Sequence, residues 1–421
     1  MILYRNLRYQ QLFDDMCSLL KPEEGEARPD AYACASQLID LAVTYGFRGN
    51  LWHCFLAFCM ANNENAYSTS CEIIGPVGGS LSELARHDFA QVRELFSLDI
   101  ARLDETENGI WSEMKHYENA LENSKAFNHR IRDRIVELSV SLENAESDQE
   151  FQDIVTEFYK EFGVGKFGLN KAFHIIMDEE AKQVDIEPIT RVEHIELNDL
   201  VGYELQKAKL IENTEAFIEG RAANNCLLFG DSGTGKSSSI KAILNQYYDR
   251  GLRMIEVYKH QFRGLSDVLE QIKDRNYKFI IYMDDLSFEE YELEYKYLKA
   301  IIEGGLGIKP QNVLIYATSN RRHLVRETFS DRTQQEDDLH NNDTVQEKLS
   351  LVARFGVSIY FGAPTPKEFK NIVKVLAEKQ HVTMSEEELL AEANKWELSH
   401  GGLTGRTAQQ FIDHLLGKVE E

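Results

Sequence analysis

The stretch from Cys226 to Ile240, CLLFGDSGTGKSSSI, narrows most sharply what this chain can fold into. A short apolar run gives way to a glycine-rich loop and then to a helical pattern, the order of a phosphate-binding loop (P-loop). Glycines let consecutive backbone N–H groups turn toward one anion, and the positive end of the following helix adds to the attraction. The sequence therefore predicts a phosphate site here; the alternative is a surface loop without a ligand.

Within this loop, a lysine and a serine carry the expected chemistry. Lys236 is expected to reach the terminal phosphates, and Ser237 to place its hydroxyl group on Mg²⁺. The residues expected to surround the phosphates are Gly230, Asp231, Ser232, Gly233, Thr234, Gly235, Lys236, Ser237 and Ser238.

Polar residues follow two further predicted strands. The apolar run 279–283 is followed by Asp284 and Asp285, and the run 313–317 leads to Asn320. Ligand sites form at the carboxyl ends of parallel strands, so Asp284 is expected to hold Mg²⁺ opposite the loop serine. Asn320 is placed to touch the γ-phosphate and the attacking water. The alternative for the two aspartates is a solvated turn.

Strands and helices alternate after the P-loop, which is typical of a parallel sheet covered by helices. We therefore expect an α/β nucleotide-binding domain over residues 191–363 and a small helical lid over 364–421. Residues 1–190 show helical periodicity and are expected to form a mainly helical N-terminal domain. The charged stretch 330–342 is interpreted as a hydrophilic insertion. A further hypothesis places Val201, Gly202 and Tyr203 beside the adenine.

The overall charge and the cysteines exclude several classes of protein. The formal net charge is −24, which disfavours nucleic-acid and anionic-membrane partners unless basic groups gather locally. No CxxC pair occurs among the six cysteines, so zinc and redox sites lack their usual spacing, and buried thiols are expected. The longest apolar run, 51–61, is too short to span a bilayer, and no signal peptide is recognisable. We expect a cytoplasmic protein.

A second glycine pattern does not predict a nucleotide site. Gly163, Gly165 and Gly168 fit GxGxxG, but the preceding residues have helical periodicity, whereas a dinucleotide fingerprint requires a strand there. The pattern is interpreted as a turn that leads into an extended segment.

The segments DLVGY, GDSGTGKS, FIIYMDD, YATSN, ARFG and GGLTGRTAQQF, in this order, resemble the AAA+ ATPases. The segments FGDSGTGKSSS, MDDLSFE, LIYATSNRRHL, EKLSLVARFG and GGLTGRTAQQF more closely resemble a bacterial ATP-binding AAA+ family catalogued as domain of unknown function eight-fifteen. The resemblance covers about residues 195–421. It implies an α/β P-loop NTPase (AAA+) core with a parallel sheet and a small helical lid, after a mainly α-helical N-terminal domain.

The resemblance also implies roles for individual residues. Lys236 and Ser237 match the Walker A motif, and Asp284 matches the Walker B carboxylate. Asn320 falls at sensor 1 and Arg406 at sensor 2. A separate arginine, Arg354, matches the finger that a neighbouring subunit contributes, which implies a homo-oligomer.

The implied activity is Mg²⁺-dependent hydrolysis of ATP to ADP and phosphate, coupled to a conformational change on an unknown macromolecule. The AAA+ pattern has glutamate where this chain has Asp285, so hydrolysis is expected to be slow or assembly-dependent unless Glu289 helps. The helical half is expected to bind an unknown protein.

Two other functions remain open at this stage. The first is a nucleic-acid-associated loader ATPase, supported only by a small basic cluster. The second is a non-hydrolysing ATP-dependent switch. A protein-remodelling pore loop is only loosely matched by Phe262 and Gly264. The basic cluster consists of Arg321, Arg322, His323 and Arg326.

Overall fold

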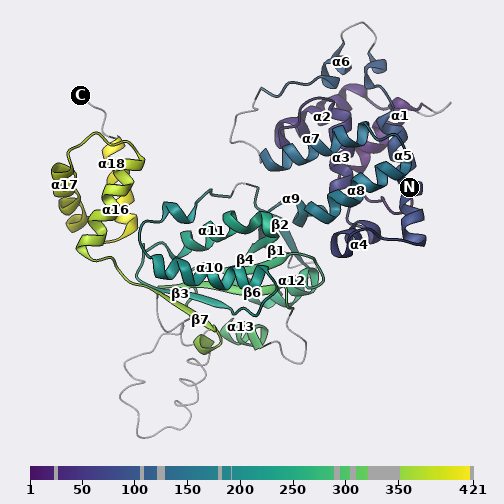
Figure 1. Cartoon of the computed structure of the whole chain (residues 1–421). Helices are drawn as coiled ribbons and strands as arrows, with labels where there is room; N and C mark the ends of the chain where they lie inside the picture. The colour runs from purple at the N-terminus through teal and green to yellow at the C-terminus, as the bar shows by residue number, and fades with distance from the viewer. Residues whose placement is uncertain are drawn as a thin grey trace. The chain divides into compact units, whose positions relative to one another are not determined.

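The computed structural model describes residues 1–22, 27–104, 109–120, 129–178, 183–190, 192–288, 294–303, 310–320 and 351–417. The chain divides into two compact units, one of residues 1–170 with 188–191 and one of residues 171–187 with 192–421 (Figure 1). The predicted insertion at 330–342, the basic cluster at 321–326 and Glu289 lie outside the described residues.

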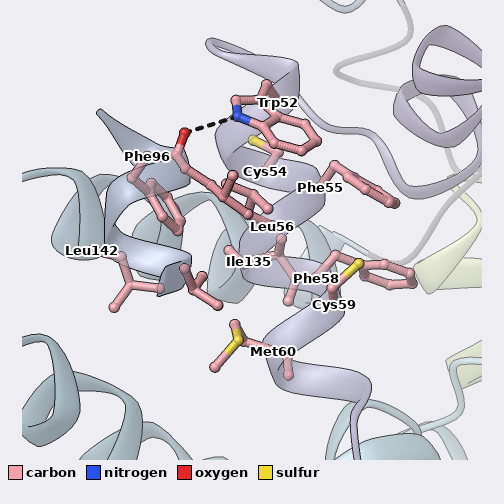
Figure 2. Close-up of a cluster of buried hydrophobic side chains, with 14 of the residues drawn as sticks. Trp52, Cys54, Phe55, Leu56, Phe58, Cys59, Met60, Phe96, Ile135 and Leu142 are labelled. Atoms are coloured by element: carbon pink, nitrogen blue, oxygen red, sulfur yellow. Dashed lines mark hydrogen bonds between the residues drawn. The ribbon is translucent and has the colours of Figure 1, made fainter. Parts of the chain in front are cut away.

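The first unit is a group of helices around one buried helix, α3. This helix is buried from Leu51 to Ala61, which accounts for the apolar run in the sequence. Its side chains meet those of α5 and α7, and Trp52 Nε1 donates a hydrogen bond to the Leu95 carbonyl oxygen at 3.1 Å (Figure 2). The elements are α1 (Gln10–Leu20), α2 (Ala31–Tyr45), α3 (Leu51–Asn62), α4 (Ala66–Ile74), α5 (Ser80–Phe96), η1 (Ile100–Leu103), α6 (Ile110–Lys115), α7 (His129–Glu143), α8 (Asp148–Phe162) and α9 (Gly165–Leu169).

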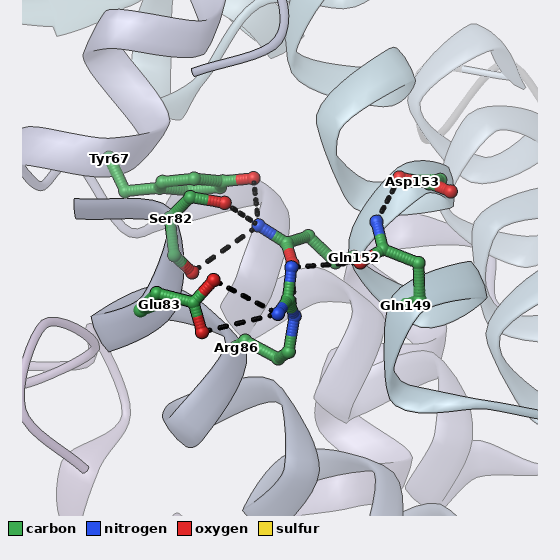
Figure 3. A network of polar contacts seen from close by, with 7 residues as sticks. All are labelled: Tyr67, Ser82, Glu83, Arg86, Gln149, Gln152 and Asp153. Carbon is green, nitrogen blue, oxygen red and sulfur yellow. Dashed lines mark hydrogen bonds and ion pairs between the residues drawn. The ribbon is translucent and has the colours of Figure 1, made fainter. Parts of the chain in front are cut away.

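A buried polar network joins three of these helices. Gln152 of α8 donates from Nε2 to the Tyr67 hydroxyl of α4 at 3.0 Å and to Ser82 Oγ of α5 at 2.7 Å. Its Oε1 accepts from Arg86 Nε at 3.1 Å (Figure 3). Because Tyr67 comes from α4 and both Ser82 and Arg86 come from α5, the network fixes how α4, α5 and α8 pack.

The cysteines of this unit are free thiols, as predicted, and all except the half-buried Cys17 are buried. Burial raises the pKa of the Cys54 thiol to about 11, which keeps it protonated. The neighbouring His53 is also buried and packs on Phe96. Among the described residues, no group of three metal-ligating side chains comes together, and no helix has the length and hydropathy of a membrane span.

The second unit is built on a seven-stranded sheet in the order β2-β1-β4-β5-β6-β3-β7. Parallel pairing joins β1, β4, β5, β6, β3 and β7. Because β3 lies between β6 and β7, the loop that follows β3 opens beside the ends of both strands. The strands are β1 (Ala172–Asp178), β2 (Gln183–Pro188), β3 (Cys226–Gly230), β4 (Leu252–Glu256), β5 (Lys278–Met283), β6 (Val313–Ser319) and β7 (Val357–Phe361).

Helices cover this sheet, with α10 and α11 packed along it (Figure 1). Three C-terminal helices form a small lid with its own apolar core around Phe369, Val373 and Phe411. The helical elements are η2 (Leu197–Asp199), α10 (Glu204–Ile218), α11 (Lys236–Tyr247), η3 (Tyr248–Arg250), η4 (Lys259–Gly264), α12 (Leu265–Ile272), α13 (Glu294–Glu303), α16 (Pro366–Lys379), α17 (Glu386–Ser399) and α18 (Gly405–Gly417).

The division into units differs from the boundary predicted at residue 190. Residues 171–187 carry β1 and β2 and belong with the sheet, because β1 pairs with β4 through Phe173 and Ile255. The GxGxxG pattern follows the helix α8, not a strand, as predicted. Its second and third glycines, Gly165 and Gly168, lie in the short helix α9 and not in the predicted turn.

Candidate functional site

The loop after β3 depends on glycine at three positions. Gly230 has φ 134°, and a Cβ atom there would lie 2.1 Å from the carbonyl oxygen of Phe361, so a side chain would separate β3 from β7. Gly233 has φ 73° and its carbonyl oxygen accepts the backbone N–H of Arg406 at 3.2 Å. Gly235, with φ 91°, is the N-cap of α11. The loop therefore touches both the sheet and the lid.

A cavity of about 810 Å³ opens at this loop. No side chain caps the N-terminus of α11 in the described structure, so the positive end of this helix faces the cavity. The lining residues are Glu193, Ile195, Asp199, Leu200, Val201, Tyr203, Ser232, Gly233, Thr234, Gly235, Lys236, Ser237, Ser238, Asp284, Asp285, Thr318, Asn320, Ile372, Leu376, Gly405, Arg406 and Gln409.

Lys236 extends from the first turn of α11 back across the loop. Its Nζ donates to the carbonyl oxygens of Gly230 at 3.0 Å and Asp231 at 2.6 Å, and to Asn320 Oδ1 at 3.0 Å. Burial lowers the pKa of Lys236, and the nearby carboxylates oppose that effect. The ammonium group is therefore fixed between the loop and the end of β6.

Asp284 accepts hydrogen bonds from hydroxyl groups of two other elements. Its Oδ1 accepts from Ser237 Oγ of α11 at 2.7 Å and from Thr318 Oγ1 of β6 at 2.5 Å. Partial burial raises the pKa of Asp284, but these hydrogen bonds lower it by more, so the net pKa lies below the ordinary value. The carboxylate is thus kept ionised.

Asp285 and Asn320 form a second polar pair. Asp285 has φ 48°, a left-handed conformation, and its backbone N–H donates to Thr318 Oγ1 at 2.9 Å. Asn320 Nδ2 donates to Asp285 Oδ1 at 2.9 Å, while its Oδ1 accepts from Lys236. The amide therefore links the lysine to the second aspartate.

The described residues fit a magnesium nucleotide. Ser237 Oγ donates a hydrogen bond to Asp284, which leaves the lone pairs of the hydroxyl oxygen for a cation, and oxygen ligands are what Mg²⁺ prefers. The uncapped helix end and Lys236 supply positive charge for phosphates beside that position.

The comparison with family models matches residues 170–419, under the description "Protein of unknown function (DUF815)". This match spans more than half of the chain. The chain belongs to the DUF815 family. The match begins at the residue before the second unit begins, so the family region includes β1 and β2. The sheet, P-loop and C-terminal helices of this DUF815 protein agree with the predicted α/β core with a parallel sheet and a small helical lid.

Comparison with solved structures matches many chains, among them three mutant forms of RuvB from Thermotoga maritima. Each of these three is 18% identical to this DUF815 chain, with TM-scores of 0.36 to 0.37. The alignments cover 52–53% of this chain and 63–64% of the RuvB chains, so this chain spans less than two thirds of their length. Comparison with curated proteins gave no match.

Most of the predicted site residues of this DUF815 protein line the cavity, including Arg406 of the lid. Two loop residues do not. Gly230 approaches β7, and Asp231 turns its carboxylate to the backbone N–H of Ala363, which donates at 2.7 Å. Asp231 therefore ties the P-loop to the start of the lid.

The predicted adenine contacts are only partly brought to the cavity. Val201 lines it and also packs on the apolar core of the lid. Tyr203 lines it too, but its hydroxyl donates to the Gly362 carbonyl oxygen at 2.8 Å. Gly202 does not line the cavity. The predicted arginine finger, Arg354, does not line it either, because it precedes the first residue of β7, at the end of this strand that is away from the P-loop.

Several lining residues were not predicted from the sequence. Thr318 is hydrogen-bonded to both aspartates through its Oγ1. Its position at the end of a buried strand is a sequence signal that could have indicated a place in the site. Ile372, Leu376 and Gln409 come from the lid, and no local pattern connects them to the P-loop.

Proposed function

We propose that this DUF815 protein is a Mg²⁺-dependent ATPase that hydrolyses ATP to ADP and phosphate and couples hydrolysis to a conformational change on a macromolecule. The observation that supports this proposal best is the meeting of Lys236, the Ser237–Asp284 pair and the Asp285–Asn320 pair in one cavity. These residues come from α11 and from the ends of β5 and β6.

The phosphates of ATP would lie against the N-terminus of α11. Lys236 would exchange its Asn320 contact for phosphate oxygens, because the ammonium group already faces that side of the loop. Arg406 lies in the first turn of the last lid helix, α18, beside Gly233, and would report the γ-phosphate to the lid. Leu376 and Ile372 provide apolar lining on the lid side for the base.

Ser237 and Asp284 would hold Mg²⁺, which would neutralise charge on the β- and γ-phosphates. The existing Ser237–Asp284 hydrogen bond orients the hydroxyl oxygen for this role. Asp284 is ionised at neutral pH because its hydrogen-bond donors keep its pKa low despite partial burial.

Asp285 is the proposed base that orients the attacking water, and Asn320 would position Asp285. A general base must come within hydrogen-bond reach of its water, and the aspartate side chain is shorter than the glutamate of the AAA+ pattern. The left-handed backbone at Asp285 changes the direction of this side chain, and we propose that this lets the aspartate act in place of the glutamate. We propose Arg354 as a residue that acts on the site of a neighbouring subunit, and the helical unit as the part that binds a protein partner.

Steady-state phosphate release with Mg²⁺ and ATP tests the proposal. Asp285→Asn should keep nucleotide affinity and lower turnover by about 10²–10⁴-fold, the range for a general base. Lys236→Ala should lose nucleotide binding, whereas Lys209→Ala, an exposed lysine on α10, should match the wild type.

Unchanged ATP affinity in Lys236→Ala would contradict the site assignment. Nucleotide binding without any turnover in the wild type would favour the non-hydrolysing switch instead. Salt-sensitive retention of DNA would favour the loader.

A further inference from the structure

A buried tyrosine hydroxyl lies next to the proposed magnesium site without a hydrogen-bond partner. Tyr282 of β5 is 3% exposed, and its hydroxyl oxygen makes no hydrogen bond within the described structure. Such a group is unfavourable, because it loses its water contacts and gains no replacement. An unpaired buried hydroxyl beside a ligand site suggests a partner that is present only when the ligand is bound.

The strand geometry places this hydroxyl group on the side of the magnesium ligands. Tyr282 is paired with Tyr316 of β6, so these two side chains share a face of the sheet. Thr318, two residues after Tyr316 on β6, lies on the same face and donates to Asp284 through Oγ1. The cross-strand partners of Tyr282 are Glu256 of β4 and Tyr316 of β6. Tyr282 does not line the cavity, so its hydroxyl approaches Asp284 from within the protein.

Asp284 and Ser237 are close enough to the Tyr282 hydroxyl to influence its pKa, yet the hydroxyl makes a hydrogen bond with neither of them. The hydroxyl is therefore available as a donor. The nearby Asp284 carboxylate is an acceptor, and its two described hydroxyl donors, Ser237 and Thr318, both bind Oδ1.

We propose that Tyr282 is a positioning residue for Mg²⁺: when magnesium nucleotide binds, its hydroxyl donates to Asp284 and holds the carboxylate facing the metal. The inference rests on the proposed function, since it requires that the cavity bind Mg²⁺ with a nucleotide. It explains why a tyrosine stands where phenylalanine would fill the same apolar space without an unpaired oxygen.

The test is the Mg²⁺ dependence of nucleotide binding in Tyr282→Phe. Affinity for a fluorescent ATP analogue is measured with EDTA and over a series of Mg²⁺ concentrations. With EDTA the variant should match the wild type. The Mg²⁺ concentration for half-maximal binding should rise by about 10–100-fold, as for other residues that orient metal ligands.

Thermal unfolding without ligand separates positioning from simple packing. Removal of an unpaired hydroxyl should leave the melting temperature of Tyr282→Phe unchanged or raise it. Tyr316→Phe is the matched control, because the Tyr316 hydroxyl contacts Asn213 at 3.0 Å and Thr214 at 2.9 Å. That variant should melt lower and keep the Mg²⁺ dependence of the wild type.

A double-mutant cycle tests whether Tyr282 acts through Asp284. In an Asp284→Asn background, Tyr282→Phe should have no further effect on Mg²⁺ dependence. If the wild type binds magnesium nucleotide and Tyr282→Phe shifts its Mg²⁺ dependence by less than about twofold, the positioning role is overturned while the proposed function stands. If the wild type binds no nucleotide with or without Mg²⁺, both are overturned.

Discussion

Hydroxyl donors from α11 and β6 set the charge of Asp284. The pKa of this carboxyl is raised by partial burial and lowered by more through Thr318 and Ser237, so it lies below its ordinary 3.8. A depressed pKa means that the ionised form is more favourable in the folded than in the unfolded protein. Asp284 therefore contributes stability above about pH 3.8, and this is lost as the pH falls through the lower folded pKa.

We expect Asp284→Asn to lower the free energy of unfolding by the same amount at pH 5 and pH 7, and by less at pH 3. Urea unfolding at the three pH values measures this difference. Asp267→Asn, an exposed aspartate on α12, provides the baseline. A difference that changes between pH 5 and pH 7 would show that a group with a higher pKa is responsible.

At the scale of the element, the turn η4 has a structural role that the sequence did not reveal. Phe262, loosely matched to a pore-loop aromatic, is 1% exposed and packs on Phe288 with ring centroids 6.3 Å apart. A Cβ atom on Gly264 would lie 2.7 Å from a methyl group of Val184. In this structure η4 packs against β1, and the Phe262 side chain is buried, so it is not exposed to contact another polypeptide chain.

Phe262→Ala should therefore destabilise the protein by about 3–5 kcal/mol, as for other large buried aromatics. Tyr258, just before η4, is 50% exposed, and Tyr258→Ala should cost less than about 1 kcal/mol. Denaturant unfolding compares the two variants. A neutral Phe262→Ala would indicate that this side chain is not part of the core in solution.

At the scale of the whole molecule, the boundary between the two units determines which fragment can fold. β1 covers the edge of β4, and a fragment that begins at residue 191 lacks both β1 and β2. An uncovered edge strand exposes unpaired backbone groups and favours association.

The fragment 171–421 should bind nucleotide as the full chain does. The fragment 191–421 should melt lower by more than about 4 °C, since about 1 kcal/mol shifts a domain of this size by 2–4 °C, and should scatter more light. Equal melting temperatures would mean that β1 and β2 are dispensable for the sheet.

Assembly is the second prediction at this scale. If Arg354 acts on a neighbouring subunit, Arg354→Ala should keep ATP affinity but lower turnover by about 10³–10⁵-fold, the range for arginine fingers. Sizing with and without ATP should show an oligomer in which this turnover occurs. A monomer with full turnover would exclude the role.

The sequence by itself determined the features that depend on neighbouring residues. The periodicity at 226–240 and 279–283 predicted the strand, loop and helix around the P-loop, because side-chain alternation and glycine conformations are local properties. The sequence also placed Lys236, Ser237 and the two aspartates at one edge of the sheet, since parallel strands bring their carboxyl ends together.

Only the tertiary structure decided the features that join distant segments. It placed β1 beside β4, buried Phe262, linked Asp231 to Ala363 and brought Thr318 to Asp284. Each depends on residues that are far apart in the chain and meet because the whole sheet packs with the least unburied apolar surface. No local pattern carries that information, because burial and pairing are properties of the folded whole.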